Sequence, residues 1–315
     1  MALNFRNMDR IKILFLLFVF SVVNGKVIGQ AFSDDELKAF QAKEDTLKQY
    51  AFNIINSKDV ATRFRSDSNF TRILVRTLQL KNSFYYPLDS LITISRIYAP
   101  DSSFRIFTWQ VLKDEDYCRQ KGCIQIRTKD GSMKIFPLRD VSEFTEGLTD
   151  TIANSGGWIG AVYYRIVLKE YFGKKTYTLF GYDENNSITT RKWIDLLEFD
   201  KDNNPVFGKY NGFSFIEDKV SRPTMNRFLL EYKKDARARI QFDEEMDMII
   251  FDHLISETSE PLKKYTLIPD GDYEGFKWKE GRWVHIDKVF DFKLKDGEAP
   301  VPMPFEEKKL PDGSN

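Results

Sequence analysis

The fold is decided by three consecutive stretches: the run Leu91-Ile-Thr-Ile-Ser-Arg-Ile-Tyr98, the turn residues Ala99-Pro-Asp-Ser-Ser103 and a second run, Phe104-Arg-Ile-Phe-Thr-Trp109. Near Leu91 the spacing of hydrophobic residues changes from a period close to 3.6 to a period of 2. A period of 2 is typical of a β-strand with one buried face, and Pro, Asp and Ser favour turns. This stretch therefore predicts a β-hairpin and marks the start of a β-rich region.

Five further pairs of strand-like runs follow, and a short polar segment separates the two members of each pair. The separating segments are residues 129–132, 173–175, 200–204, 243–247 and 279–282. Asp130-Gly131 is a strong signal, because Asp-Gly suits a two-residue hairpin turn. Consecutive strands joined by tight turns pair antiparallel. We predict a mainly β protein with a large antiparallel β-meander domain over residues 89–290, built as a sandwich, a barrel or an irregular propeller.

The residues before this domain predict a helical segment over 32–88. Ser33 and Glu36 have the spacing of a capping box, and apolar residues then recur at helical intervals through residue 56. A second helix is predicted over 70–80, with Asp67 or Ser68 as its cap.

Residues 1–31 have the pattern of a secretory signal peptide. Arg6, Arg10 and Lys12 precede an apolar run over 13–23 that is short for a membrane span. Cleavage is expected after Gly25 or Ala31, with an uncleaved membrane anchor as the alternative. We expect an exported protein of the periplasm, the outer-membrane surface or the extracellular space, without a transmembrane span in the mature chain and with an extended or disordered tail over 291–315.

The overall charge argues against a nucleic-acid partner. The 315 residues include 47 Lys plus Arg and 47 Asp plus Glu, so the net charge is zero and no basic stripe is evident. Aromatic residues make up 15% of the chain, which favours strands.

Four segments resemble a known group of proteins. They are Phe104-Arg-Ile-Phe-Thr-Trp109, Tyr177-Thr-Leu-Phe-Gly-Tyr-Asp-Glu-Asn-Asn186, Met248-Ile-Ile-Phe-Asp-His-Leu254 and Pro269-Asp-Gly-Asp-Tyr-Glu-Gly275. Together they resemble a family of uncharacterised exported β-rich proteins of Bacteroidetes-type bacteria, over about residues 70 to 290. The resemblance implies a Gram-negative envelope setting and carries over no catalytic residues.

Candidate catalytic and metal-binding residues are few. Asp252-His253 has the residue types of a base with its orienting carboxylate, but no G-x-S-x-G nucleophile motif is present. The sets Asp200, Asp202, Asn204 and Asp270, Asp272, Glu274 have the alternate spacing of calcium loops, yet neither completes the motif and β-turns use the same residues. We predict no catalytic, metal or cofactor site.

Three further features remain. Asn154-Ser-Gly-Gly-Trp-Ile-Gly160 is interpreted as a connection into a strand rather than a phosphate loop.

Trp278 and Trp283 flank a short turn and form a candidate surface aromatic cluster, against the alternative of ordinary packing. Cys118 and Cys123, the only cysteines, are predicted to form a disulfide across a tight turn, because export places them in an oxidising compartment.

The sequence thus favours a non-catalytic envelope protein that binds a protein or glycan partner. The alternative is an extracytoplasmic hydrolase acting on a polymer, with His253 and nearby acids as candidates.

Overall fold

The computed structural model describes residues 32–215 and 223–290. The chain is mainly β, with two helices followed by antiparallel sheets, so the predicted fold class is confirmed. The expectations for the signal peptide and for the tail lie outside the described residues.

The two long helices are α2 (Asp34–Asn56) and α3 (Val60–Leu78). The predicted capping box is confirmed, since the Ser33 side chain accepts from the Glu36 amide and the Glu36 carboxylate accepts from the Ser33 amide. The predicted start of the second helix was wrong. Asp59 is the cap and accepts a hydrogen bond from the Thr62 amide, so this helix begins about ten residues earlier than predicted.

Three open sheets make up the β region. The N-terminal sheet contains β1 (Ser95–Tyr98), β2 (Phe104–Leu112), β3 (Cys118–Ile126) and β4 (Lys134–Arg139). The central sheet contains β5 (Ala153–Asn154), β6 (Val162–Tyr171), β7 (Lys174–Asp183), β8 (Thr189–Phe199), β9 (Pro205–Phe207) and β11 (Phe228–Lys233). The C-terminal sheet contains β10 (Phe213–Ser214), β12 (Ile240–Asp243), β13 (Met248–Ser256), β14 (Leu267–Lys279) and β15 (Arg282–Ile286).

Short 3-10 helices lie in the connections between these elements. They are η1 (Ser83–Tyr85), η2 (Ser142–Phe144), η3 (Leu148–Asp150), η4 (Ser155–Gly157) and η5 (Lys264–Thr266).

All six predicted hairpins form, as the antiparallel pairs β1–β2, β3–β4, β6–β7, β8–β9, β12–β13 and β14–β15. Three pairings depart from a plain meander. β5 adds to β9, β11 adds to one end of β8, and β10 pairs with β15 in parallel. The β region is therefore a set of stacked meanders in which a few short strands join distant parts of the chain.

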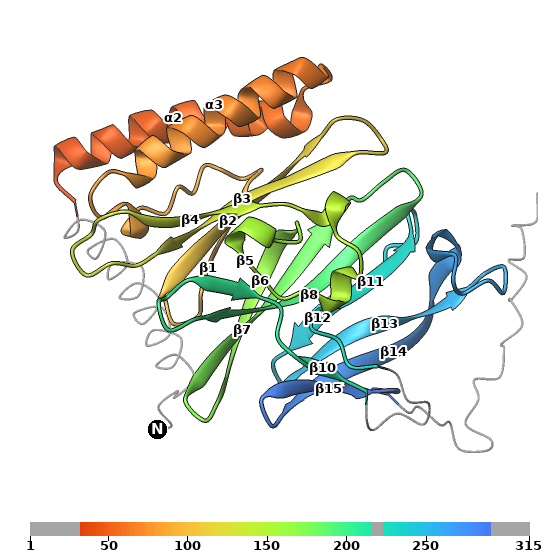
Figure 1. The fold of residues 1–315 in the computed structure, drawn as a ribbon. Helices are drawn as coiled ribbons and strands as arrows, with labels where there is room; N and C mark the ends of the chain where they lie inside the picture. Colours follow the sequence, from red (N-terminus) through yellow and green to blue (C-terminus); the bar gives the residue numbers. More distant parts are fainter. Residues whose placement is uncertain (1–31, 216–222, 291–315) are drawn as a thin grey trace, which may run out of the picture.

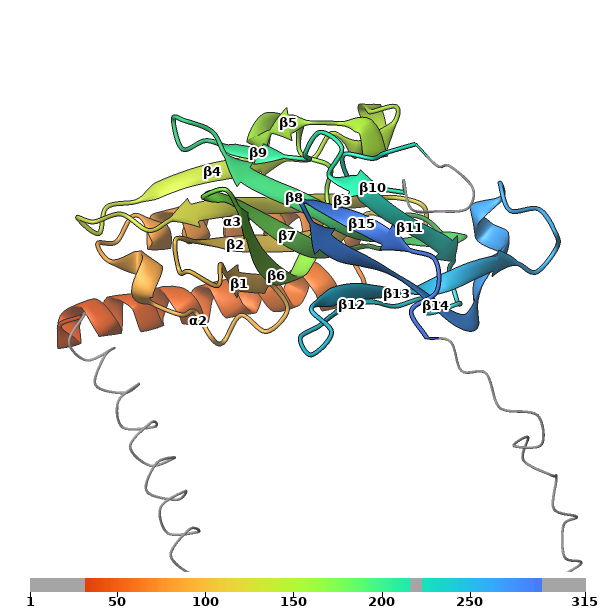
Figure 2. The same cartoon turned by 90° about the horizontal axis from the view of Figure 1, so that it is seen from below.

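The molecule is layered, in the order helices, N-terminal sheet, central sheet, C-terminal sheet (Figure 1). Figure 2 also places the helices and the C-terminal sheet at opposite sides of the molecule. β2 shows why these layers stack. Phe107 and Trp109 belong to the core beneath the helices, whereas Phe104 and Ile106 belong to the core shared with the central sheet. Since successive strand residues point to opposite faces, β2 is covered on both sides.

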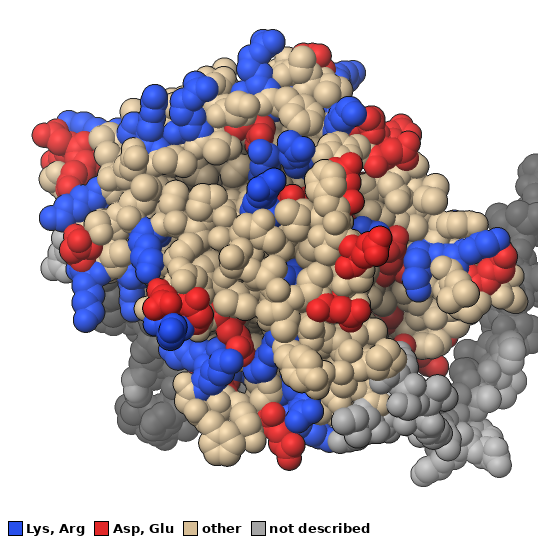
Figure 3. Space-filling model, viewed as in Figure 1, with Lys and Arg blue, Asp and Glu red and all other residues tan. Residues whose placement is uncertain are grey.

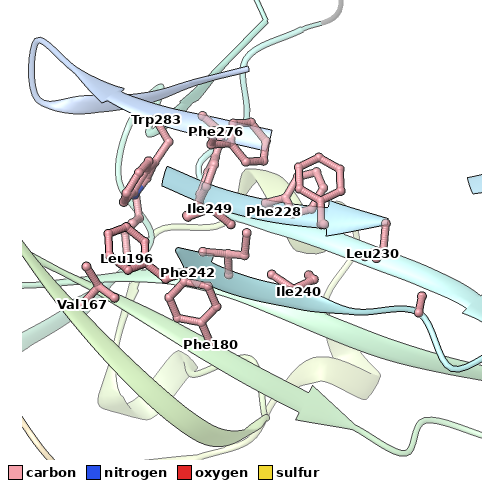
Figure 4. Packing of buried hydrophobic residues seen from close by; sticks show 14 of the residues in the cluster. Val167, Phe180, Leu196, Phe228, Leu230, Ile240, Phe242, Ile249, Phe276 and Trp283 are labelled. Atoms are coloured by element: carbon pink, nitrogen blue, oxygen red, sulfur yellow. The ribbon is translucent and has the colours of Figure 1, made fainter. Parts of the chain in front are cut away.

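The central and C-terminal sheets enclose a third core. Figure 4 shows Phe180 and Leu196 of the central sheet facing Ile249, Phe276 and Trp283 of the C-terminal sheet. These side chains are fully buried, so this interface is a packed interior between two sheets.

The disulfide predicted between Cys118 and Cys123 is absent, and both thiols are free. The two residues lie on the continuous strand β3, opposite Leu112 and Phe107 of β2, so no turn separates them. Five strand residues span about 16 Å, well beyond the ~4.4–6.8 Å that a disulfide allows between Cα atoms. Burial raises the pKa of both thiols, that of Cys123 to about 12, which makes them poor nucleophiles.

Candidate functional site

A hollow of about 680 Å³ opens where the N-terminal and central sheets meet at one end. Four turns surround it, namely those that join β1 to β2, β3 to β4, β6 to β7 and β8 to β9. We call this hollow the basic mouth. Turns held at one end of a rigid antiparallel scaffold are where binding residues of β proteins commonly lie.

The floor of the basic mouth is aromatic. Phe104 of β2 contacts Tyr177 of β7 with ring centroids 4.8 Å apart, and Phe199 at the end of β8 with centroids 5.2 Å apart. Phe104 and Tyr177 are buried, and Phe199 is half-buried. Because these rings also belong to the core between the two sheets, the floor is held rigidly by packing.

The walls are cationic. Arg127, Lys129 and Lys134 line the side formed by the N-terminal sheet, and Lys174 and Lys175 line the opposite side. Figure 3 shows Lys and Arg side chains interspersed with Asp and Glu side chains at the lower left of the molecule. Asp101 is the one carboxylate among the described lining residues.

Lys174 and Lys175 are anchored in place. Lys174 pairs with Glu198, which also binds Lys209 at 2.8 Å. Lys175 donates to Asp101 at 2.8 Å. The remaining three cations, Arg127, Lys129 and Lys134, form no ion pair with a carboxylate of the described chain. They leave an uncompensated positive charge on one wall.

Two acidic turns beside the basic mouth direct their carboxylates to their own backbone. Asp130 accepts hydrogen bonds from the amide and hydroxyl of Ser132. Asp200 accepts from the amides of Asp202 and Asn204. The Asp200 carboxylate therefore closes its own β-turn in this structure.

Asp101 joins the two sheets across the basic mouth. Its carboxylate accepts from the Lys175 ammonium, from the Tyr177 hydroxyl at 2.9 Å and from the Ser103 hydroxyl at 2.6 Å. Partial burial by itself would raise the pKa of Asp101, but hydrogen bonds from Lys175, Ser103 and Tyr177 outweigh burial and lower it to about 2.

We expect Asp101→Asn to remove part of the acid sensitivity of folding. A carboxyl whose folded pKa is below its unfolded value of about 3.9 contributes stability above that unfolded value, and loses it as the pH falls through the folded pKa. The contribution of Asp101 should therefore disappear between about pH 4 and pH 2, and should amount to about 1–2 kcal/mol. Urea unfolding at pH 7, 4 and 2 measures it. If the free energy of unfolding fell by the same amount between pH 4 and pH 2 in the wild type and in Asp101→Asn, the lowered pKa would not belong to Asp101.

Trp278 and Trp283 do not form an exposed surface cluster. They face each other across the β14–β15 pair with ring centroids 5.2 Å apart, but Trp283 is fully buried and donates to Thr178 Oγ1 at 3.0 Å. Trp278 is half-buried, with the Lys209 ammonium 5.5 Å from its ring centroid. The pair packs the core between the central and C-terminal sheets instead.

The side chains of Asp252 and His253 have different hydrogen-bond partners and do not contact each other as a base and its orienting carboxylate would. Asp252 is buried and accepts from the Arg239 amide at 2.7 Å, whereas His253 Nδ1 lies 2.8 Å from Asp270 Oδ2. His253 Nε2 faces Glu274 at 3.9 Å. Both ring nitrogens of His253 thus face carboxylates rather than a nucleophile, an arrangement that gives no support to a hydrolytic dyad.

In the second calcium-like set, Asp270, Asp272 and Glu274, each carboxylate contacts a different side chain. Asp270 binds His253, Asp272 lies 3.5 Å from the Lys288 ammonium, and Glu274 Oε2 lies 2.6 Å from His285 Nε2. Within residues 32–215 and 223–290, no group of three or more potential ligands is arranged to hold a metal ion.

The Gly-rich segment packs as an ordered connection into β6. Trp158 is fully buried and donates to the Tyr163 hydroxyl at 2.9 Å. The Gly160 amide donates to Asp140 Oδ1 at 3.0 Å, and a Cβ at position 160 would clash with Gln120. The predicted connection into a strand is therefore confirmed.

The sequence alone does not predict the basic mouth. Two of its basic runs, Arg127-Thr-Lys129 and Gly173-Lys-Lys175, lie in or beside segments that the sequence marks as turns. Their positive charge is local to each turn, and only pairing of the sheets brings the runs together. No local signal could have indicated that they share one hollow.

Comparison with known proteins gives no match: no protein-family model, curated protein or solved structure is similar to this chain. In the described part of the chain, no helix has both the length and the apolar character required to cross a membrane.

Proposed function

We propose that this protein is a non-catalytic binding protein of the bacterial envelope that holds an anionic glycan in the basic mouth. The observation that carries the proposal is a concave site lined by five cations and one carboxylate over an aromatic floor. The basic residues Arg6, Arg10 and Lys12 and the apolar run over 13–23 support a location outside the cytoplasm.

An anionic ligand is favoured by the charge of the wall. Arg127, Lys129 and Lys134 have no carboxylate partner in the described chain, so a ligand carboxylate or sulfate would meet cations that are free to pair. A concave surface strengthens this attraction, because low-dielectric walls focus the field of charges of one sign.

A saccharide is favoured by the other lining groups. Ser103, Thr128 and Asn203 supply side-chain donors and acceptors around the aromatic floor. Ligand sites commonly combine an apolar base with a few polar groups that set orientation, and a volume of about 680 Å³ is within the usual range for such sites. A few sugar rings with acidic substituents would match this combination.

The test is binding of purified protein to polygalacturonate, alginate and heparin, with neutral dextran as the uncharged comparison. We expect binding to at least one acidic polymer, none to dextran, and weaker binding as salt rises from 50 to 300 mM. The triple variant Arg127→Gln, Lys129→Gln, Lys134→Gln should bind about 10- to 100-fold more weakly, since each exposed ion pair contributes up to about 1 kcal/mol.

A matched control removes three exposed cations elsewhere, as Lys58→Gln, Arg72→Gln and Lys264→Gln. Both triple variants change the net charge equally. If the basic mouth is a specific site, the variant at positions 127, 129 and 134 should lose affinity for the acidic polymer, and the control variant should bind it almost as the wild type does. Equal losses in the two variants, or no binding to any of the acidic polymers, would refute the proposal.

A further inference from the structure

A second hollow lies at the opposite end of the N-terminal and central sheets from the basic mouth. Strand β3 begins at Cys118 in this hollow and ends at Ile126 in the basic mouth, whereas β7 runs from Lys174 in the basic mouth to Asp183 in the hollow. The hollow has a volume of about 200 Å³, which suits one small group. We call it the acidic pocket. Its charged lining residues are Asp116, Arg119, Asp140, Glu143, Asp183 and Arg191.

Asp183 is a buried carboxylate with one oxygen that the chain does not use. Its exposed fraction is 7%, and its Oδ1 accepts from Gln120 Nε2 at 2.8 Å and from the Asn185 amide at 3.0 Å. Within residues 32–215 and 223–290, Oδ2 accepts no hydrogen bond and the carboxylate forms no ion pair. Its cross-strand neighbour Arg191 pairs with Glu231 at 3.0 Å instead. Burial raises the pKa of Asp183, as expected for a carboxyl that lacks a close cation.

Gln120 supplies a second open acceptor beside this carboxylate. The residue is 3% exposed, and its Oε1 is buried without a hydrogen-bond partner in the part of the chain that the structure describes. Because Nε2 of the same amide donates to Asp183, Oε1 lies next to the Asp183 carboxylate. Reversing the amide would bring two acceptors face to face, so the hydrogen bond fixes its orientation. Buried acceptors without donors are unfavourable, and two of them side by side call for a donor with positive charge.

Asp140 adds negative charge to the acidic pocket but leaves little room for a metal ion. Its Oδ1 accepts from the Ser142 amide and hydroxyl and from the Gly160 amide, and its Oδ2 accepts from the Gln120 amide at 3.2 Å. The carboxylate is therefore already saturated by the chain. The absence of a three-ligand metal group from the described residues agrees with this. A cation that binds through hydrogen bonds fits the remaining acceptors better than a metal does.

We propose that the acidic pocket binds a primary ammonium group carried on a short aliphatic stem. The ammonium has three N–H donors, which match Asp183 Oδ2 and Gln120 Oε1, and hydrogen bonds between charged partners are the strong ones. Tyr117 and Phe144 line the same pocket and give the stem an apolar surface. Phe144 is 83% exposed, so a bound stem would cover a ring that the fold leaves in solvent. This inference is independent of the proposed function of the basic mouth.

The test is isothermal titration calorimetry of the purified full chain with pentylammonium chloride. Pentanol, tetramethylammonium chloride and calcium chloride are the comparison ligands, all at the same ionic strength. We expect saturable binding of pentylammonium at one site per chain, with a Kd in the low millimolar range or tighter. Pentanol lacks the charge and tetramethylammonium lacks the N–H donors, so both should bind about tenfold more weakly or worse.

Two variants and a matched control locate the site. Asp183→Asn keeps the shape of the side chain and an acceptor for the Gln120 and Asn185 donors, and should weaken binding about 10- to 100-fold. Its Tm should not fall, because it removes a buried charge that has no close cation. Glu143→Gln at the exposed rim should weaken binding about 2- to 3-fold. The control Asp252→Asn changes an equally buried carboxylate on β13, 8% exposed, and should bind as the wild type does.

The remaining outcomes would overturn the inference. These are no saturable binding of pentylammonium, equal losses in Asp183→Asn and Asp252→Asn, and equal affinities for pentanol and pentylammonium. Binding of calcium that depends on Asp183, without binding of pentylammonium, would replace the ammonium with a metal ion. If Asp183→Asn failed to fold, the comparison of ligands on the wild type and the loss in Glu143→Gln would still decide the question.

Discussion

Arg105→Met is expected to lower the free energy of unfolding by about 4 kcal/mol. Arg105 lies on β2 between the N-terminal sheet and the residues that follow the helices. It is fully buried and has no carboxylate partner within residues 32–215 and 223–290. Its guanidinium donates 2.8 Å hydrogen bonds to Gln125 Oε1, to the Tyr86 and Ser83 carbonyls and to the Tyr98 hydroxyl. It also lies over the Phe107 ring, 4.7 Å from the centroid.

The size of the expected loss follows from the acceptors. The carbonyls of Ser83 and Tyr86 and the side-chain oxygen of Gln125 would stay buried without these donors, and each such loss costs about 1–3 kcal/mol. A methionine fills part of the space but donates nothing. Arg105→Lys should also be destabilising, because one ammonium group cannot reproduce the planar fork of donors.

Urea unfolding monitored by circular dichroism measures this loss. The matched control is Arg119→Met on the neighbouring strand β3, where the side chain is exposed and the expected change is within about 0.5 kcal/mol. If Arg105→Met were as mild as Arg119→Met, Arg105 would not be a structural link between the 83–86 segment and the sheet.

The parts of the fold that the sequence predicts well are local. Each of the six hairpins is specified by a turn and by the strands beside it, and the start of α2 is specified by Ser33 and Glu36 within one turn of helix. The start of α3 was mispredicted because Asp59 and Asp67 are equally good caps in sequence. Asp67 instead accepts a hydrogen bond from Trp109 Nε1 at 2.8 Å, a contact 42 residues away that no local pattern reveals.

The parts that could not be predicted depend on contacts between layers. The period of β2 indicates one buried face, but the helical region covers one face of β2 and the central sheet covers the other, so Arg105 becomes interior. Packing of the C-terminal sheet on the central sheet likewise buries Trp283, which a turn-flanking position had suggested was near the surface. It also assembles the basic mouth from four separate turns. The candidate site is therefore a product of tertiary structure, whereas most strands are a product of local sequence.

A second buried charge pair is the ion pair of Arg227 with Asp195. Arg227 Nη1 lies 3.2 Å from Asp195 Oδ2, and the Tyr163 hydroxyl donates to the same oxygen at 3.0 Å. The exposed fractions of the two charged side chains are 0% and 3%. Breaking such a pair by removing one partner typically costs about 3–5 kcal/mol, because the other charge stays buried without compensation.

The two possible single substitutions should differ in their pH dependence. Asp195→Asn leaves a guanidinium that cannot lose its proton, so the stability of this variant should gain no pH dependence from this site. Arg227→Met leaves a carboxyl that can take up a proton. Burial raises the pKa of Asp195 even beside Arg227, and removing the guanidinium should raise that pKa further. An acid whose folded pKa exceeds its unfolded value binds more protons when folded, so stability falls as the pH rises above about 4 toward the folded pKa.

We therefore expect Arg227→Met to lose up to about 1.4 kcal/mol of stability for each pH unit between pH 5 and pH 7, beyond the change in Asp195→Asn over the same range. Urea unfolding of the wild type and both variants at pH 5, 6 and 7 measures this difference. Parallel pH profiles for the two variants would mean that the Asp195 carboxyl stays ionised without Arg227. Tyr163 and the Leu196 amide, which donates to Oδ1 at 2.9 Å, would then be sufficient to hold a buried carboxylate, and the ion pair would not be what compensates this charge.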